Sequence, residues 1–363
     1  MIKKIFGFTI LGLYLLVMAV ASTTGPLVSL QSVILGLLGL IVITIGISAL
    51  AKSIGLVDIP DNIRKIHTGN IPLIGGIVIF ISIVYGTFVF GVDPFYRIII
   101  ISLIPILIIG TIDGIRAITV PVPFRLIAQI LASWIVILFT DVYLRDLGNL
   151  FGQGTVQLNQ FGIPFTIFAV VGICNAFNML DGKDGLAGSV AVVIISSLFL
   201  LLYFNGIIYN WGLILILSLA VFLAFNMSLF GQHQKIFLGE HGSSSLGHLI
   251  AWNLVYLSQE TDFITPVTAL WFVFFPLTDA LLTITRRIRI SQSIVKADRR
   301  HLHYLLSDRG FSDQTVLLVV VFISIIGAAT AVTVNLFNIP DYNLFYGYLT
   351  VVVCLWLLGR VQT

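Results

Sequence analysis

Long apolar segments separated by short polar ones run through the whole chain. A helix needs about 20 predominantly apolar residues to cross a bilayer. Such runs occupy residues 5–21, 28–50, 71–90, 98–112, 126–140, 161–177, 188–204, 211–230, 246–257, 264–284, 316–334 and 345–358. They are continuously apolar, whereas the strands of a membrane barrel alternate lipid-facing and lumen-facing residues. The pattern therefore predicts an all-α, polytopic transmembrane helical bundle of about 11–12 spans.

The composition excludes a soluble protein. Of 363 residues, 58% are hydrophobic and only 10% are charged, against roughly 25% charged in soluble domains. We expect one integral membrane domain over residues 1–363. Residues 1–24, with Lys3 and Lys4 at the start and Ala19-Val20-Ala21 near the end, fit either an extra N-terminal span or a signal-like segment.

The basic residues indicate the orientation. If Lys3 and Lys4 lie in the cytoplasm, alternation of the spans also places there every other Lys and Arg except Arg97 and Arg145. Cytoplasmic loops carry this excess of basic residues in membrane proteins. The segment 285–314 is then a cytoplasmic basic loop. Cys174 and Cys354 lie in apolar runs, which predicts packing residues and no disulfide.

The end of the sixth apolar run has the most distinctive polar pattern. Asn175, Asn178, Asp181 and Asp184 follow at steps of three, so they share one side while the backbone stays helical. Carboxylate and amide oxygens suit Mg²⁺, which typically takes one or two carboxylates plus substrate phosphates. This segment therefore indicates a metal and phosphate site. The alternative is a capped helix end with a solvated turn.

A second polar segment follows the second apolar run. Arg64, Lys65 and His67 precede the pair Gly75-Gly76. Basic side chains next to glycines suit a polyanion, because the backbone can approach a ligand closely where there is no Cβ. The competing interpretation is ordinary charge on a cytoplasmic loop.

Three isolated acidic residues are further candidates. Asp113 ends the fourth run, where a helix cap is the simpler explanation. Glu240, one of two glutamates in the chain, lies among small residues that leave room for a ligand, although a plain Gly/Ser turn is the alternative. Asp279 lies inside the tenth run, and ionisable residues at such depth are either functional or paired with a nearby Arg.

The basic loop ends in a cluster suited to phosphate. Arg299, Arg300, His301 and His303 stand within five positions, and guanidinium and imidazole groups bind phosphate oxygens. A zinc site is a poorer explanation, since no further His or Cys is near in sequence. Simple positive charge on a cytoplasmic loop is the alternative.

Taken together, these motifs resemble the polyprenyl-phosphate N-acetylhexosamine-1-phosphate transferase family, in particular its bacterial undecaprenyl-phosphate members. The resemblance covers residues 52–310 and is most specific at 175–188 and then 237–242. It implies transfer of a sugar 1-phosphate from a UDP-amino sugar to undecaprenyl phosphate, with release of UMP and a need for Mg²⁺ or Mn²⁺. It also implies a multi-pass protein of the bacterial inner membrane with its active site at the cytoplasmic face.

The resemblance assigns a role to each candidate. Asn178 and Glu240 would hold the metal. Asp113, Asp181 and Asp184 would be catalytic, with Asp113 facing the lipid phosphate. The expected substrate-binding residues are Arg64, Lys65, His67, Asn175, Arg299, Arg300, His301 and His303. The expected partners are the UDP-amino sugar, undecaprenyl phosphate and membrane lipid, with no nucleic acid. The oligomeric state is left open, with a homodimer as one candidate.

The chain departs from the family pattern at three positions. The family usually has a second Asp where Gly114 stands, Asp in place of Glu240, and His in place of Tyr304. We predict that Gly114 and Glu240 compensate, the missing side chain giving room to the longer carboxylate. The rival functions are a catalytically impaired relative that binds lipid phosphate or acts as a scaffold, and a transporter, whose sites usually lie near the bilayer midplane.

Overall fold

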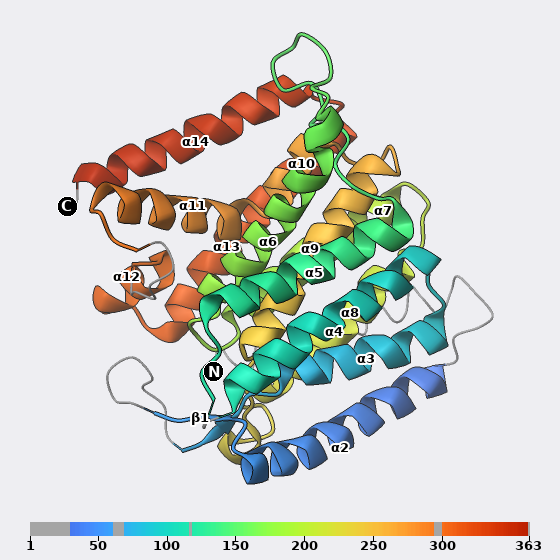
Figure 1. The fold of residues 1–363 in the computed structure, drawn as a ribbon, viewed down its shortest axis with the longest axis vertical. Helices are drawn as coiled ribbons and strands as arrows, with labels where there is room; N and C mark the ends of the chain where they lie inside the picture. The colour runs from blue at the N-terminus through green and yellow to red at the C-terminus, as the bar shows by residue number, and fades with distance from the viewer. Residues whose placement is uncertain (1–29, 61–68, 116–117, 294–299, 362–363) are drawn as a thin grey trace.

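A computed structural model describes residues 30–60, 69–115, 118–293 and 300–361, and helices dominate this part of the chain (Figure 1). The helices are α2 (Leu30–Ile54), α3 (Gly75–Phe90), α4 (Pro94–Gly114), α5 (Val122–Thr140), α6 (Gly162–Leu180), α7 (Leu186–Phe204), α8 (Asn210–Asn226), α9 (Glu240–Gln259), α10 (Pro266–Phe272), α11 (Phe274–Arg289), α12 (Leu302–Asp308), α13 (Asp313–Leu336) and α14 (Asp341–Val361). Strands β1 (Val57–Asp58) and β2 (Ile71–Pro72) pair antiparallel, with Val57 opposite Pro72.

The predicted apolar runs correspond to helices in order, from 28–50 at α2 to 345–358 at α14. The run 5–21 lies outside the described residues. The run 264–284 differs from the prediction, because it divides at Val273 into α10 and α11, which are bent by 84° relative to each other. Pro276 lies near the start of α11. In a continuous helix it could not donate an N–H to the carbonyl four residues earlier, and its ring would clash with that carbonyl, which favours a break here.

The prediction of a polytopic membrane helical bundle is confirmed. Six helices in the described ranges are long and apolar enough to cross a membrane, or seven if the bent pair forms one span. The shorter apolar helices α3 and α8 have 16 and 17 residues. The sequence estimate of 11–12 spans is larger because it also counted these two helices, the runs at α9 and α14, and the run 5–21 outside the described residues.

Five connections meet at one end of the bundle. Leu56 bridges to Ile115, and Leu73 bridges to Phe237, which joins the segments after α2, α4 and α8. The α6–α7 turn joins them through the side chain of Asn226, which accepts a hydrogen bond from the Gly185 N–H. The first turn of α12 lies against the same α6–α7 turn. In Figure 1, β1 and α12 both lie toward the left ends of the long helices.

Helix α9 occupies the centre of this end, and glycines let its neighbours approach it. A Cβ on Gly76 would lie 2.5 Å from Cα of Gly242, and one on Gly247 would lie 2.5 Å from Cα of Cys174. The N–H groups of Gly75 and Gly76 donate to the carbonyls of Phe237 and Leu238 at 2.9 and 3.0 Å. The Gly75-Gly76 pair therefore serves the packing of α3 against the segment before α9, and its amides bind protein carbonyls.

The opposite end of the bundle has a separate set of polar contacts. Arg145, in the connection between α5 and α6, forms an ion pair with Glu260 at 2.7 Å. Asp341, at the start of α14, accepts a hydrogen bond from Thr265 at 2.7 Å and from the Asn149 N–H at 3.2 Å. These contacts fix the green connection at the top of Figure 1 to α14.

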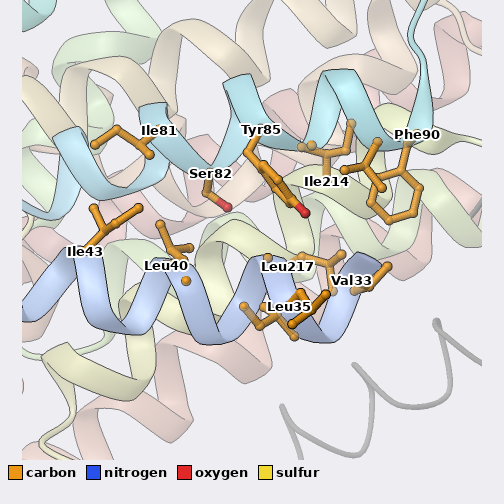
Figure 2. Close-up of a pocket in the computed structure, with 15 residues that line it drawn as sticks. Val33, Leu35, Leu40, Ile43, Ile81, Ser82, Tyr85, Phe90, Ile214 and Leu217 are labelled. Carbon is orange, nitrogen blue, oxygen red and sulfur yellow. The ribbon is translucent and has the colours of Figure 1, made fainter. Parts of the chain in front are cut away.

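A cavity of about 260 Å³ lies between α2, α3 and α8 (Figure 2). Apart from Ser82 and Tyr85, its lining residues are apolar or glycine. It is formed by the first half of α2 and the last half of α3, so it lies toward the end opposite the five connections. None of the candidate site residues lines it.

Candidate active site

The acidic turn between α6 and α7 begins where α6 ends, at Leu180. Asn175 and Asn178 lie in the last turns of α6, and Asp181 follows as the residue that ends it, with its N–H bonded to the Phe177 carbonyl at 3.2 Å. The chain then reverses through Gly185, whose φ of 75° is a conformation that favours glycine. The predicted constant spacing thus holds up to Asp181, and Asp184 belongs to the turn.

Amide and hydroxyl side chains connect α5, α6 and α9 beneath this turn. Asn175 donates to Oε1 of Gln129 at 2.8 Å, and Gln129 donates to Oγ of Ser244 at 3.2 Å. Asn178 donates to Oγ of Ser243 at 3.1 Å. Because Nδ2 of Asn178 makes this bond, its Oδ1 is the atom left to accept from a ligand or coordinate a cation. The Ser243 hydroxyl therefore connects the predicted metal ligand Asn178 to the first turn of α9.

A second group of charges joins α4, α5 and α9. Arg125 pairs through Nη1 with Oε2 of Glu240, and the same Nη1 lies 3.7 Å from Oδ2 of Asp113. The other oxygen of Asp113 accepts the Val120 N–H at 2.8 Å. All three charged side chains are largely shielded, with 20–27% of each exposed. The structure therefore brings the predicted residues Asp113 and Glu240 together on one guanidinium.

The structure gives no support to the predicted steric compensation between Gly114 and Glu240, which stays a prediction. A Cβ on Gly114 would lie 2.7 Å from Cδ1 of Leu56 and 3.5 Å from Cδ1 of Leu73. The missing side chain of Gly114 therefore gives room to the segments around the β1–β2 pair. The longer Glu240 side chain is accounted for by its pairing with Arg125.

Asp184 is tied to the segment before α9. Its Oδ2 accepts from Nζ of Lys235 at 2.6 Å, and the lysine side chain is only 10% exposed. Asn226 makes a parallel connection: its Nδ2 donates to the Ile236 carbonyl at 2.9 Å while its Oδ1 accepts the Gly185 N–H at 2.6 Å. The acidic turn and the segment 235–240 are thus held as one unit.

Two of the acidic groups hold their protons more tightly than usual. Burial raises the pKa of Asp181 to about 7, and the carboxylates of Asp184 and Asp58 add to the rise. Burial also raises the pKa of Glu240 to about 7, although the Arg125 guanidinium opposes that rise. Asp181 follows the apolar part of α6, and Glu240 precedes that of α9. Carboxyl groups whose pKa is shifted this strongly are candidates for functional sites.

Residues 301–304, which we call the histidine segment, pack against the acidic turn. His301 and His303 are buried, and their rings stack with centroids 5.7 Å apart. A Cβ on Gly182 would overlap Nε2 of His303 and would lie 2.7 Å from the Tyr304 hydroxyl. Gly182 is therefore needed where His303 and Tyr304 pack on the turn. Asp279 contacts His301 at 2.8 Å, so a histidine is its charged partner among the residues that the structure describes.

The remaining predicted residues divide into two groups. The main-chain carbonyl of Arg300 accepts from Arg286 at 3.1 Å, which places the predicted phosphate ligand beside the histidine segment. Arg64, Lys65, His67 and Arg299 lie outside the described residues.

The donor atoms fit a hard divalent cation. Asn178 and Glu240 offer an amide and a carboxylate oxygen. Ser243 connects Asn178 to the backbone of Glu240, since its hydroxyl accepts from Asn178 and donates to the main-chain carbonyl of Glu240 at 3.2 Å. Within the described ranges no three His, Cys, Asp or Glu side chains form a ready metal cage. Mg²⁺ usually takes only one or two carboxylates and completes its shell with substrate phosphates and water.

Three residues of this site were missed as candidates from sequence. Arg125 and Lys235 were counted only as cytoplasmic positive charges, and Asn226 was not singled out at all. Each contacts a residue at least 10 positions away, and Arg125 contacts one 115 positions away. The only local signal was the presence of polar residues at the ends of apolar helices.

Comparison with known proteins identifies the family of the chain. Residues 96–258 match the family model described as glycosyl transferase family 4. The chain is similar to proteins named undecaprenyl-phosphate alpha-N-acetylglucosaminyl 1-phosphate transferase. The relative from Escherichia coli K12 is 34% identical over 74% of both chains. The one from Haemophilus influenzae is 33% identical over 87% of this chain and 90% of its own length. The resemblance seen in the motifs is thereby confirmed, and the chain belongs to glycosyl transferase family 4.

Proposed function

We propose that this protein transfers an N-acetylhexosamine 1-phosphate from a UDP-amino sugar to undecaprenyl phosphate, with release of UMP. The observation that carries the proposal is the convergence of Asp113, Asp184 and Glu240 with Arg125 and Lys235 at one end of the bundle. The relatives named above supply the chemical identity of the lipid acceptor.

The charges of this site suit a reaction between two phosphates. Phosphoryl transfer depends mainly on positioning the two anions and neutralising the charge that develops between them. Arg125 and Lys235 are shielded cations held by carboxylates, so they are oriented before a substrate arrives. An arginine can also bind a phosphate through two parallel hydrogen bonds.

The reaction is an exchange of one phosphoanhydride bond for another. An oxygen of the lipid phosphate attacks the sugar-bearing phosphorus of the donor, and the bond from that phosphorus to the bridging oxygen of UMP breaks. The leaving electron pair stays on UMP. The product is a lipid pyrophosphate that carries the sugar. We assign the acceptor side to Asp113 and the neighbouring Arg125, and the donor side to Asp181, Asp184 and the histidine segment.

Asn178 and Glu240 are the residues that would hold Mg²⁺, or Mn²⁺ in its place. When bound, the cation would neutralise charge on the donor's phosphates. Because Glu240 is held by Arg125 in the structure, the cation and the guanidinium compete for one carboxylate. We therefore expect activity to depend on an added divalent cation.

We place the site at the cytoplasmic face of the bacterial inner membrane. The five connections at the site's end, together with the helix ends beside them, carry most of the basic residues in the sequence, whereas the opposite end carries Arg97 and Arg145. This distribution is typical of a cytoplasmic face. A soluble nucleotide sugar and a membrane-bound lipid phosphate can meet there.

The experiment is a transfer assay with purified protein, undecaprenyl phosphate and labelled UDP-N-acetylglucosamine, with and without Mg²⁺. Asp184→Asn is expected to abolish lipid labelling, because it removes a charge from the site and the partner of Lys235. Asp141→Asn is the matched control: it lies at the opposite end, its side chain is 86% exposed, and Asn tolerates its positive φ of 55°.

The outcomes separate the rival functions. Lipid labelling by the wild type and the Asp141→Asn variant, but not by Asp184→Asn, supports the enzyme. Binding of undecaprenyl phosphate without labelling from N-acetylglucosamine, N-acetylgalactosamine or deoxy-sugar donors would favour the impaired, lipid-binding relative. Uptake of labelled donor into sealed vesicles without lipid labelling would favour transport.

A further inference from the structure

One face of α11 holds the histidine segment. Asp279, Thr283 and Arg286 follow at steps of four and three, so they share this face. Oδ2 of Asp279 lies 2.8 Å from Nδ1 of His301, and Oγ1 of Thr283 lies 3.3 Å from the same nitrogen. Arg286 donates to the Arg300 carbonyl at 3.1 Å. The whole stripe is therefore directed at the residues that lead into α12.

Both oxygens of Asp279 are used. The second, Oδ1, accepts the N–H of Leu302 at 2.9 Å. The side chains of Asp279 and His301 are 12% and 4% exposed, so this carboxylate depends on these two contacts to compensate for its burial. A carboxylate can only accept, so Nδ1 of His301 must carry the hydrogen. Nε2 is then the ring nitrogen left for another partner.

The orientation of His301 matters to the acidic turn. Its ring lies parallel to that of His303, with planes within 6° of each other. His303 in turn packs on Gly182, in the turn that carries Asp181 and Asp184. His301 is thus connected to the acidic turn through the single stacked ring of His303.

We propose that Asp279 is a positioning residue that fixes the tautomer and orientation of His301, so that Nε2 carries no hydrogen and can accept a hydrogen bond from a hydroxyl or N–H group of the substrate. This inference rests on the proposed sugar-phosphate transfer and adds a residue to it. Asp279 acts through His301 and is not itself catalytic.

The test uses a substitution that preserves shape and changes only the donor pattern. In Asp279→Asn, the amide oxygen can still accept the Leu302 N–H, but an amide N–H then faces Nδ1 of His301. The imidazole must accept there and carry its proton on Nε2. Loss of such an orienting partner typically costs about 10- to 100-fold in activity, and we expect a fall in kcat of that size. Thr285→Val, an exposed position on the same helix, is the control and should keep wild-type kcat.

A second background separates positioning from folding. In a His301→Ala protein, Asp279→Asn should lower the residual transfer rate by less than twofold, because the residue through which it acts is gone. Asp279→Glu, which retains the carboxylate, should recover part of the loss. An equal loss from Asp279→Asn in both backgrounds would overturn the inference in favour of a structural role, as would wild-type kcat in Asp279→Asn. Absence of transfer in the wild type would instead refute the proposed function.

Discussion

The Asn226→Leu variant should weaken the connection between the acidic turn and the segment 235–240. Asn226 is 4% exposed and makes two hydrogen bonds with its side chain. Its amide donates to the Ile236 carbonyl at 2.9 Å, and its carbonyl accepts the Gly185 N–H at 2.6 Å. Leucine has a similar size but can make neither bond, so the variant tests the polar connection with little change in packing.

The expected loss in the free energy of unfolding follows from the two backbone groups that lose their hydrogen-bond partner. Gly185 and Ile236 are both buried, so one N–H and one carbonyl would lose their partner. Each buried group without a partner costs about 1–3 kcal/mol, which gives about 2–6 kcal/mol for the two. We expect the lower half of that range, because these segments lie at the end of the bundle, where water can replace the amide.

The assay measures thermal unfolding in detergent together with the rate of lipid labelling. We expect Asn226→Leu to lower the unfolding temperature and to lose most transfer, because Asp184 and Lys235 lie in the two segments that Asn226 joins. Asn205→Leu is the control: Asn205 ends α7 at the opposite end, is exposed, and donates to the Leu201 carbonyl of its own helix. Wild-type stability and rate in Asn226→Leu would refute the argument that this amide couples the two segments.

Three further predictions follow from the same contacts. Gly182→Ala should displace His303 and Tyr304 and reduce transfer at least tenfold, whereas Gly172→Ala, which has nothing within 4 Å of its added Cβ, should keep the wild-type rate; equal rates in both would contradict the packing argument. Because the pKa of Asp181 is about 7 in the folded protein and 3.8 ordinarily, the folded state binds more protons between these values and loses stability as pH rises through them. Asp181→Asn should therefore unfold at a higher temperature than the wild type at pH 8, with a smaller difference at pH 4, and the reverse order would show that the carboxyl is not destabilised by burial. Gly114→Asp and Glu240→Asp should lower transfer by factors that multiply, because Gly114 faces Leu56 while Glu240 pairs with Arg125; a double variant more active than that product would restore the idea of compensation.

Most of the helices could be predicted because of how a membrane restricts backbone structure. Without water, every backbone N–H and carbonyl must bond within the chain, so a long apolar run has almost no alternative to a helix. The break at Val273 was not predicted, although Pro276 is visible in the sequence. A proline in an apolar run signals a kink or a break, but the bend of 84° between α10 and α11 depends on tertiary packing.

The candidate site was predictable where its chemistry is local. Asn175 and Asn178 lie in the last turns of α6 and Asp181 directly follows it, so their spacing alone placed them together. The pairing of Arg125 with Glu240 joins residues 115 positions apart, and no local pattern reports it. Asp279 was singled out for its depth in an apolar run, yet its partner His301 is evident only from the structure, which brings the residue before α12 against α11.

The most direct test of the proposed function distinguishes which bond of the donor breaks. UDP-N-acetylglucosamine labelled with ³²P at the phosphorus next to the sugar is incubated with purified protein, undecaprenyl phosphate and Mg²⁺. Transfer of a sugar 1-phosphate predicts that the ³²P enters the lipid fraction and that unlabelled UMP is released in equal amount. Release of ³²P-labelled UDP together with a lipid that carries sugar but no ³²P would contradict the account, because the sugar alone would then have been transferred.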